Sequence, residues 1–177
     1  MRRMVLGLLV LMTTFALALP ATIAAQDSEA TPEASATAAF GEPVSYIGES
    51  GSEIATLTVT QMVRPWDEYD EFYDPQTGTE YVAFEIEVEH LGRRGDLVVR
   101  GFDFRLQDVD GFLISQAFAD AADGSDLTPT EEDLAIAPGE TESVVVVFQV
   151  IEGIELSNLY WLPDYDRMIT LADLTDI

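Results

Sequence analysis

The chain has 177 residues, and its 33 acidic side chains outnumber its eight arginines, so the formal net charge is −25 at pH 7. It contains no cysteine, which excludes disulfides, thiol catalysis and cysteine-ligated metal sites. The acidity argues against nucleic acids and anionic lipid surfaces as partners, because both require clustered Lys or Arg to neutralise phosphate.

The N-terminus has the pattern of a secretory signal peptide over residues 1–25. Two arginines precede an uncharged apolar run, Pro20 ends that run, and small residues follow, with a cleavage position after Ala24 or Ala25. An uncleaved membrane anchor is the alternative, since the run nearly reaches the roughly 20 residues that span a bilayer. We expect cleavage, no stable membrane insertion afterwards, and a protein that is secreted or held in the cell envelope.

Residues 26–42 are rich in Ala, Thr, Ser, Glu and Pro and hold almost no large apolar side chain. Such a segment cannot bury enough surface to offset the entropy of ordering, so we interpret it as a flexible linker. Short alternating segments separated by turn residues begin at residue 43. Residues 43–177 have a length that suits one domain.

The first two strands are predicted over residues 44–47 and 54–63, the second with apolar residues on one face and threonines on the other. The segment 66–75 follows, with four aromatic and five acidic residues. Its aromatic residues at 66, 69 and 73 fit one side of a short helical turn.

Residues 81–91 form the clearest strand, because apolar and glutamate side chains alternate with a period of two. Further strands are expected over residues 97–99, 102–107, 112–118, 134–136, 141–150, 156–162 and 168–171, with a hairpin turn at 108–111 and a long polar loop over 119–133. The pattern predicts an all-β, antiparallel, immunoglobulin-like β-sandwich of about seven to nine strands.

The segment Pro138–Val150 is predicted to be a central strand, because a Pro-Gly turn leads into a β-branched apolar run. Its even-numbered residues from Val144 to Val150 are expected to face the same core as Val82–Val88. Val145 and Val147 then lie on the opposite face. Either a loop such as the Trp66 segment covers them, or they form an exposed apolar patch that marks a contact surface.

Several ordered motifs share an order and spacing with a known family; they are Thr79–Val88, Phe102–Gly111, Ala137–Thr141, Val147–Val150 and Leu159–Tyr160. The chain resembles, over roughly residues 41–171, secreted bacterial immunoglobulin-like domains of unknown function that are related in fold to the mycobacterial immunoprotective extracellular protein. The resemblance implies a secreted or envelope-attached β-sandwich and no catalytic residues. His90 departs from it, since the family commonly has Asn at this strand end.

The aromatic segment provides the candidate binding residues Trp66, Tyr69, Phe72 and Tyr73. Exposed aromatic side chains on a loop can stack on sugar rings or anchor a protein, so a protein or carbohydrate partner is predicted. The alternative is structural: Trp66 and one or two tyrosines cap the open end of the sandwich core.

The acidic loop over residues 119–133 provides a second hypothesis, in which Asp120, Asp123 and Asp126 wrap a Ca²⁺ ion and the ion orders the loop. The alternative is a solvated acidic surface that keeps the protein soluble. No cofactor is otherwise expected. The Asp108–Gly111 stretch lacks the closing glutamate of a calcium loop and is interpreted as a turn between paired strands.

An enzymatic function is not predicted, because no nucleophile and base occur at a recognisable spacing. His90 is the one histidine in the sequence, so any histidine-dependent triad or zinc site would rest on it alone. It is interpreted as a residue at the rim of the core.

Overall fold

The computed structural model describes residues 40–164, 167–175 and 177. The predicted signal peptide and nearly all of the linker lie outside these residues. The strands are β1 (Val44–Ile47), β2 (Glu53–Val63), β3 (Thr79–His90), β4 (Leu97–Val99), β5 (Phe104–Asp108), β6 (Leu113–Ser115), β7 (Leu134–Ile136), β8 (Thr141–Ile151), β9 (Leu156–Asp164) and β10 (Arg167–Asp173). Two single-turn 3₁₀ helices, η1 (Glu71–Tyr73) and η2 (Gly101–Asp103), interrupt them.

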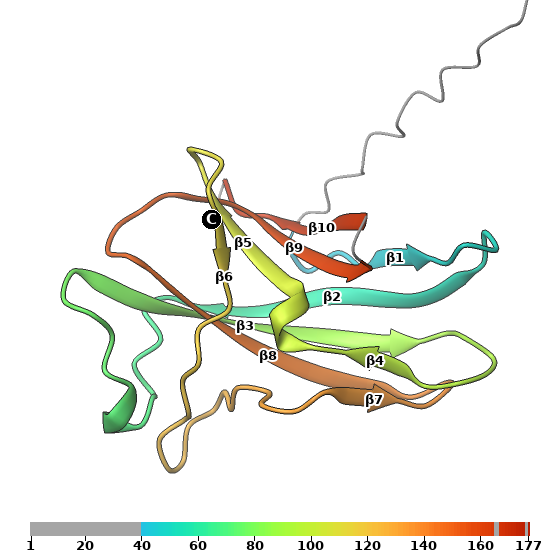
Figure 1. The fold of residues 1–177 in the computed structure, drawn as a ribbon, viewed down its shortest axis with the longest axis horizontal. Coiled ribbons are helices and arrows are strands. Elements are labelled where there is room, and N and C mark those ends of the chain that lie inside the picture. Colours follow the sequence, from blue (N-terminus) through green and yellow to red (C-terminus); the bar gives the residue numbers. More distant parts are fainter. Residues whose placement is uncertain (1–39, 165–166, 176) are drawn as a thin grey trace, which may run out of the picture. The chain divides into compact units, whose positions relative to one another are not determined.

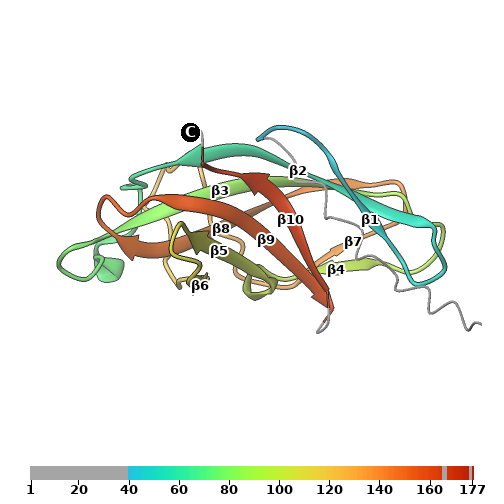
Figure 2. The same ribbon diagram turned by 90° about the horizontal axis from the view of Figure 1, so that it is seen from above.

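The strands form two four-stranded antiparallel sheets, in the orders β1-β2-β3-β8 and β10-β9-β5-β6, and a separate β4-β7 pair. In Figure 1, β5, β9 and β10 lie over β2, β3 and β8, and Figure 2 shows the same layers from above. The predicted all-β antiparallel sandwich is confirmed. The described residues form ten strands, where about seven to nine were expected, and the short β4 and β7 pair with each other. No helix among the described residues has the length and hydropathy to cross a bilayer.

The main core lies between the two four-stranded sheets. Strands β3 and β8 are in register, with Val82 opposite Phe148 and Phe84 opposite Val146. All four of these side chains are buried, as the period-two pattern predicted. The second sheet contributes Phe104 and Trp161, whose rings stack with centroids 6.4 Å apart. The predicted inner faces of these two strands are therefore correct, but β8 lies at the edge of its sheet, so the prediction of a central strand is wrong.

Two predicted strands differ most from the observed ones. Phe102 lies in η2, not in a strand, and its side chain is 56% exposed, so the inward alternation starts at Phe104. The strand expected over 112–118 is limited to β6, because the chain then turns away to β8. There Gln116 pairs with Phe148, and the Ala117 N–H donates to the Val147 carbonyl at 2.8 Å.

A polar cluster joins the two sheets at one edge. The Arg167 guanidinium on β10 donates to the Tyr46 hydroxyl on β1 at 2.9 Å and lies over its ring, with 4.8 Å to the centroid. Arg167 also pairs with Asp164 and donates to the Ile47 carbonyl. The Asp164 hydrogen bond raises the pKa of Arg167 further, which stabilises the cation in this bridge. These contacts hold β1 against the β9–β10 hairpin.

Candidate interaction surface

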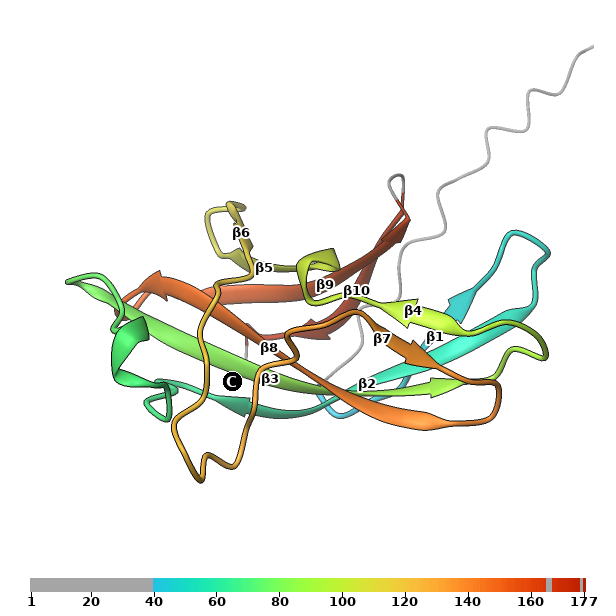
Figure 3. The same cartoon turned by 60° about the horizontal axis from the view of Figure 1, so that its bottom comes forward.

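Two loops cover part of the outer face of the β1-β2-β3-β8 sheet. They are residues 64–78, between β2 and β3, and residues 116–133, between β6 and β7, and we call them the covering loops. Figure 3 shows the second of them crossing β8. Beneath them lies a second apolar cluster, separate from the main core, made of Trp66, Tyr81, Ala83, Ala119, Leu127, Val145 and Val147. The loop alternative for Val145 and Val147 is thus the correct one.

The covering loops are joined to each other by backbone hydrogen bonds. Asp70 N–H donates to the Asp120 carbonyl at 2.9 Å, and Ala122 N–H donates to the Glu68 carbonyl at 2.7 Å. The Glu68 carboxylate accepts from the Ser125 hydroxyl at 2.7 Å and from the Asp126 N–H at 2.8 Å. These donors, chiefly Ser125, lower the pKa of Glu68. The two loops therefore form one hydrogen-bonded unit.

The second covering loop also satisfies the outer edge of β8. Thr130 N–H donates to the Val145 carbonyl at 2.9 Å, and the Thr130 hydroxyl accepts from the Val145 N–H at 3.0 Å. Together with the Ala117 contact, these bonds occupy backbone groups that an edge strand otherwise leaves unpaired. The polar loop predicted over 119–133 is thus an extension of the sheet edge as well as a cover.

Trp66 does not lie on the exposed surface. Its side chain is 1% exposed and packs edge-to-face with Tyr69 and Tyr81, each with ring centroids 6.1 Å away. The expectation that it offers an exposed ring is therefore wrong, because the outward Val145 and Val147 give the indole an apolar surface to cover. The alternative, in which Trp66 has a structural role, is correct in its burial, but Trp66 covers a sheet face and not the open end of the sandwich.

The other three predicted binding residues differ in exposure. Tyr69 and Tyr73 are half-buried, and the Tyr73 carbonyl accepts from the Tyr81 hydroxyl at 2.8 Å. Phe72 is 88% exposed at the tip of η1. The predicted helical turn is thus limited to three residues. A binding role for this set stays a prediction, with Phe72 as the member fully available to solvent.

A hollow of about 260 Å³ lies beside the covering loops, and we call it the aromatic hollow. Three aromatic side chains line it, Tyr73, Phe102 and Phe118, of which Phe118 is 88% exposed. Its acidic lining residues are Asp120, Glu131, Glu132 and Asp133. Sequence reasoning missed Phe102 and Phe118 because both occur in alternating segments that predict strands. The available signal was that Phe118 directly precedes the polar loop.

Negative charge dominates at the Tyr73 end of this hollow. The pKa of the Tyr73 phenol is raised, first by its hydrogen bond to Asp120, then by the charges of Asp120, Glu131 and Asp70. Near Phe102 the charge is mixed: Arg100 lies 5.7 Å from the ring centroid and pairs with Asp133 at 3.0 Å. The hollow thus combines apolar rings with carboxylates.

The three aspartates of the calcium hypothesis have three different environments. Asp120 contacts Tyr73, Asp126 donates its N–H to Glu68, and Asp123 is exposed. Within residues 40–164, 167–175 and 177, no group of three His, Cys, Asp or Glu side chains is placed to hold a metal ion. Ordering of the loop by Ca²⁺ stays a prediction.

His90 and Asp108 have structural roles. His90 is buried, and its Nδ1 lies 2.9 Å from the Ile136 carbonyl, to which it donates. A Cβ at Gly92 would lie 2.3 Å from the His90 Nε2, so Gly92 covers the other nitrogen closely. The Asp108 carboxylate accepts from the Phe112 N–H at 2.8 Å, which supports the predicted turn between paired strands.

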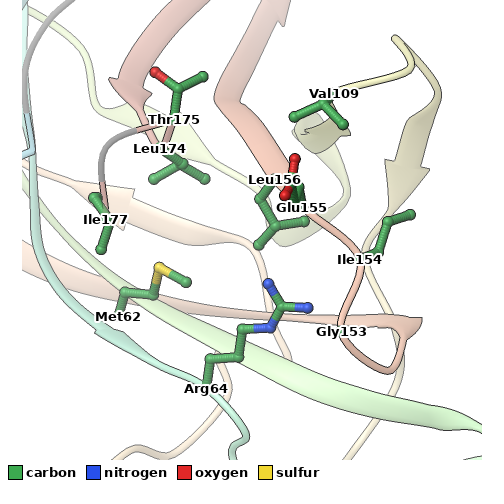
Figure 4. Close-up of a pocket in the computed structure, with 10 residues that line it drawn as sticks. All are labelled: Met62, Arg64, Val109, Gly153, Ile154, Glu155, Leu156, Leu174, Thr175 and Ile177. Carbon is green, nitrogen blue, oxygen red and sulfur yellow. The ribbon is translucent and has the colours of Figure 1, made fainter.

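A further hollow of about 340 Å³ lies between the end of β2, the start of β9 and the C-terminal residues. Figure 4 shows the Arg64 guanidinium pointing toward Glu155 and Leu156, with Met62 to the left of Arg64. Arg64 pairs with Glu80 at 2.7 Å, so its charge is already neutralised within the protein. We therefore place the candidate site at the aromatic hollow.

The immunoglobulin-like β-sandwich defined by these sheets occurs in solved bacterial structures. The chain is similar to the candidate lipoprotein ycdA of Bacillus subtilis subsp. subtilis str. 168, at 18% identity and a TM-score of 0.54, over 78% of this chain and 40% of ycdA. It is similar to the secreted protein MPT63 of Mycobacterium tuberculosis, at 13% identity and a TM-score of 0.50, over 75% of this chain and 92% of MPT63. The Bacillus subtilis protein yjhA aligns at 16% identity and a TM-score of 0.50, over 75% of this chain and 97% of yjhA.

These likenesses confirm the fold relationship to a secreted mycobacterial protein that the sequence motifs indicated. At such identities they establish the fold alone. No family model and no curated protein matches the chain. Function must therefore be argued from the surface.

Proposed function

We propose that this protein is exported and acts in the cell envelope or outside the cell as a non-catalytic binding module. The signal-like N-terminus, and secreted and lipoprotein-type proteins among those of similar fold, support export. The partner contacts the surface formed by the covering loops and η2. A protein partner fits this surface better than a sugar, because Trp66, the largest ring of the predicted set, is buried.

The observation that carries this proposal is the pair of exposed phenylalanines, Phe102 and Phe118, that line one hollow. Scattered single apolar residues are ordinary on protein surfaces, whereas rings grouped around a concave site mark interaction surfaces. The loop that carries Phe118 is fixed by hydrogen bonds to β8. Binding therefore requires little additional ordering of this surface.

The binding function is tested by capture from the envelope and culture fluid of cells that naturally make the protein. The bait is the chain in the form these cells accumulate, beside a Phe102→Ser/Phe118→Ser variant. Phe112→Ser is the matched control, because Phe112 is also exposed but lies on the β5–β6 turn. We expect one partner retained by the unaltered chain and the control and lost from the double variant. Equal capture by all three baits would contradict the proposal.

Export is tested separately by fractionation and N-terminal sequencing of the accumulated protein. Cleavage after Ala24 or Ala25, with the product outside the cytoplasm, is the expected result. An uncleaved chain in the cytoplasm would contradict it. This measurement does not depend on the binding surface, so export and binding can fail independently.

A further inference from the structure

We propose that the aromatic hollow binds a lysine or arginine side chain on an extended segment of a partner protein. This inference rests on the proposed binding function and names the chemistry of its partner. The side chain's aliphatic stem lies against Phe118 and Phe102, and its charged end meets Asp120 and Glu131, which line the same hollow.

Charge complementarity selects the cation. Four carboxylate residues line the hollow together with its three aromatic side chains. Asp133 already pairs with Arg100, but an anionic or purely apolar partner would have to desolvate the other three carboxylates without compensation, whereas a cation can pair with them. The aromatic faces add to the selection, because a ring face attracts a cation and a long side-chain stem packs on it.

The chain's own Arg100 already makes a cation–ring contact of this kind with Phe102. Its guanidinium lies 5.7 Å from the Phe102 centroid and pairs with Asp133 at 3.0 Å. A ring and a carboxylate thus act together on one cation at this edge of the hollow. Phe118 with Asp120 and Glu131 offers the same two groups to a cation from outside.

The shape of the surface favours a protein segment over a small free amine. Phe102 also lines a second hollow of about 240 Å³, with Arg105, Leu162 and Pro163 on its walls. In an extended chain, successive side chains point to opposite sides at about 3.3 Å per residue, so every second side chain points to the same side. Two such side chains of one segment can therefore enter the two neighbouring hollows. A small amine fills one hollow and leaves Phe102 and Leu162 in water. The partner segment therefore carries an apolar residue near its basic residue.

The test is fluorescence anisotropy with the protein in the form that the cells accumulate. The probe is a short fluorescein-labelled peptide in which glycine separates a lysine from a leucine. The comparison peptide has glutamate in place of lysine. We expect binding of the lysine peptide alone, weakened about tenfold by Phe118→Ser and by Asp120→Asn/Glu131→Gln. The matched controls are Phe112→Ser and Glu87→Gln/Glu89→Gln, which remove an equal ring and equal charge elsewhere; they should bind as the unaltered chain does.

Three results would overturn the inference, and the first is that the lysine peptide does not bind. If Asp120→Asn/Glu131→Gln and Glu87→Gln/Glu89→Gln weaken peptide binding equally, the peptide responds to net charge alone. Displacement by spermine at the affinity of the peptide would mean that the hollow takes free amines and not a segment. Each variant is first checked by urea unfolding, and if one is unstable, amide NMR shifts of Gly101 and Ala119 in the unaltered chain locate the bound peptide instead.

The outcome is separable from the proposed function. Capture of a partner that depends on Phe102 and Phe118, combined with no binding of the lysine peptide, would leave the binding module standing and reject the basic segment. Loss of both would reject both.

Discussion

The outer face of the β1-β2-β3-β8 sheet has two halves that differ in what covers them. Toward the start of β3 the outward residues are Tyr81 and Ala83, paired with Gln149 and Val147, and the covering loops bury the apolar members of this group. Toward its end the outward residues are Glu85, Glu87 and Glu89, paired with Val145, Ser143 and Thr141. The neighbours of Glu87 and Glu89 on that face lie on the adjacent strands of the same sheet, with the Thr56 hydroxyl donating to Glu89 at 3.3 Å, and both glutamates are exposed.

The comparison shows that one strand can combine two environments while its inner face stays uniform. From Val82 to Val88 the inward side chains are apolar without interruption. The outward side chains change from apolar to acidic at Glu85, and the covering loops end at the partner of that residue, Val145, which Thr130 contacts. The outward residues therefore determine how far the loops can extend over the sheet.

The largest effect is expected from a charge placed in the covered half. Val147→Asp buries an unpaired carboxylate under the loops and should lower the free energy of unfolding by about 4 kcal/mol. Ser143→Asp adds the same charge to the half that the loops do not cover, the bare half around Glu87 and Glu89. It should change the free energy of unfolding by less than about 0.5 kcal/mol. Urea unfolding measures both. Equal losses would show that the two halves do not differ in burial as described.

Removing the indole of the covered half should have a smaller but still large effect. Trp66→Ala leaves a cavity beneath the loops and should cost about 3 kcal/mol. The sandwich itself should persist, because Trp66 belongs to the separate outer cluster. Native-state hydrogen exchange should then show faster exchange at Ala117 and Ala122, with Phe84 and Phe148 still protected. Loss of protection at all four amides would instead mean that the covering loops and the sandwich unfold together.

A moderate, pH-dependent effect is expected where the loops join. Glu68 has a lowered pKa because it accepts from Ser125 and from the Asp126 N–H. A carboxylate with a lowered pKa in the folded state stabilises it above the unfolded-state pKa, and this contribution is lost as pH falls through the folded-state value. Ser125→Ala should raise the Glu68 pKa toward its ordinary value, so the stability that this carboxylate contributes becomes smaller and its loss on acidification is complete at higher pH. NMR titration of the Glu68 side chain measures this; an unchanged pKa would contradict the assignment.

The smallest effect belongs to the bare half. Glu87 lies between Glu85 and Glu89 on one face of β3, so Glu87→Gln removes a like-charge repulsion and should raise stability by about 0.3 kcal/mol at low salt. The gain should disappear at high salt, because exposed charges are screened. Urea unfolding at two salt concentrations measures it. A loss of stability would mean that Glu87 has a partner on this face.

The sequence pattern predicted the sandwich and the inner faces of its long strands, because a period of two directly reflects burial on one side. It left open what covers Val145 and Val147, since that depends on contacts between loops far apart in the chain. For the same reason it left open whether Trp66 is exposed or buried, and it placed Phe118 in a strand. Local alternation carries no information on which loop meets which face, so the aromatic hollow became visible only in three dimensions.

The hydrogen bonds between residues 116–130 and β8 also bear on self-association. Residues 144–148 are a run of valines and a phenylalanine with high β-propensity and no charge, the type of segment that pairs edge to edge between molecules when it is open. With Ala117 and Thr130 bonded to this strand, its edge is already occupied within one molecule. The covering loops thus act against aggregation, and a change that loosens them should lower solubility as well as stability.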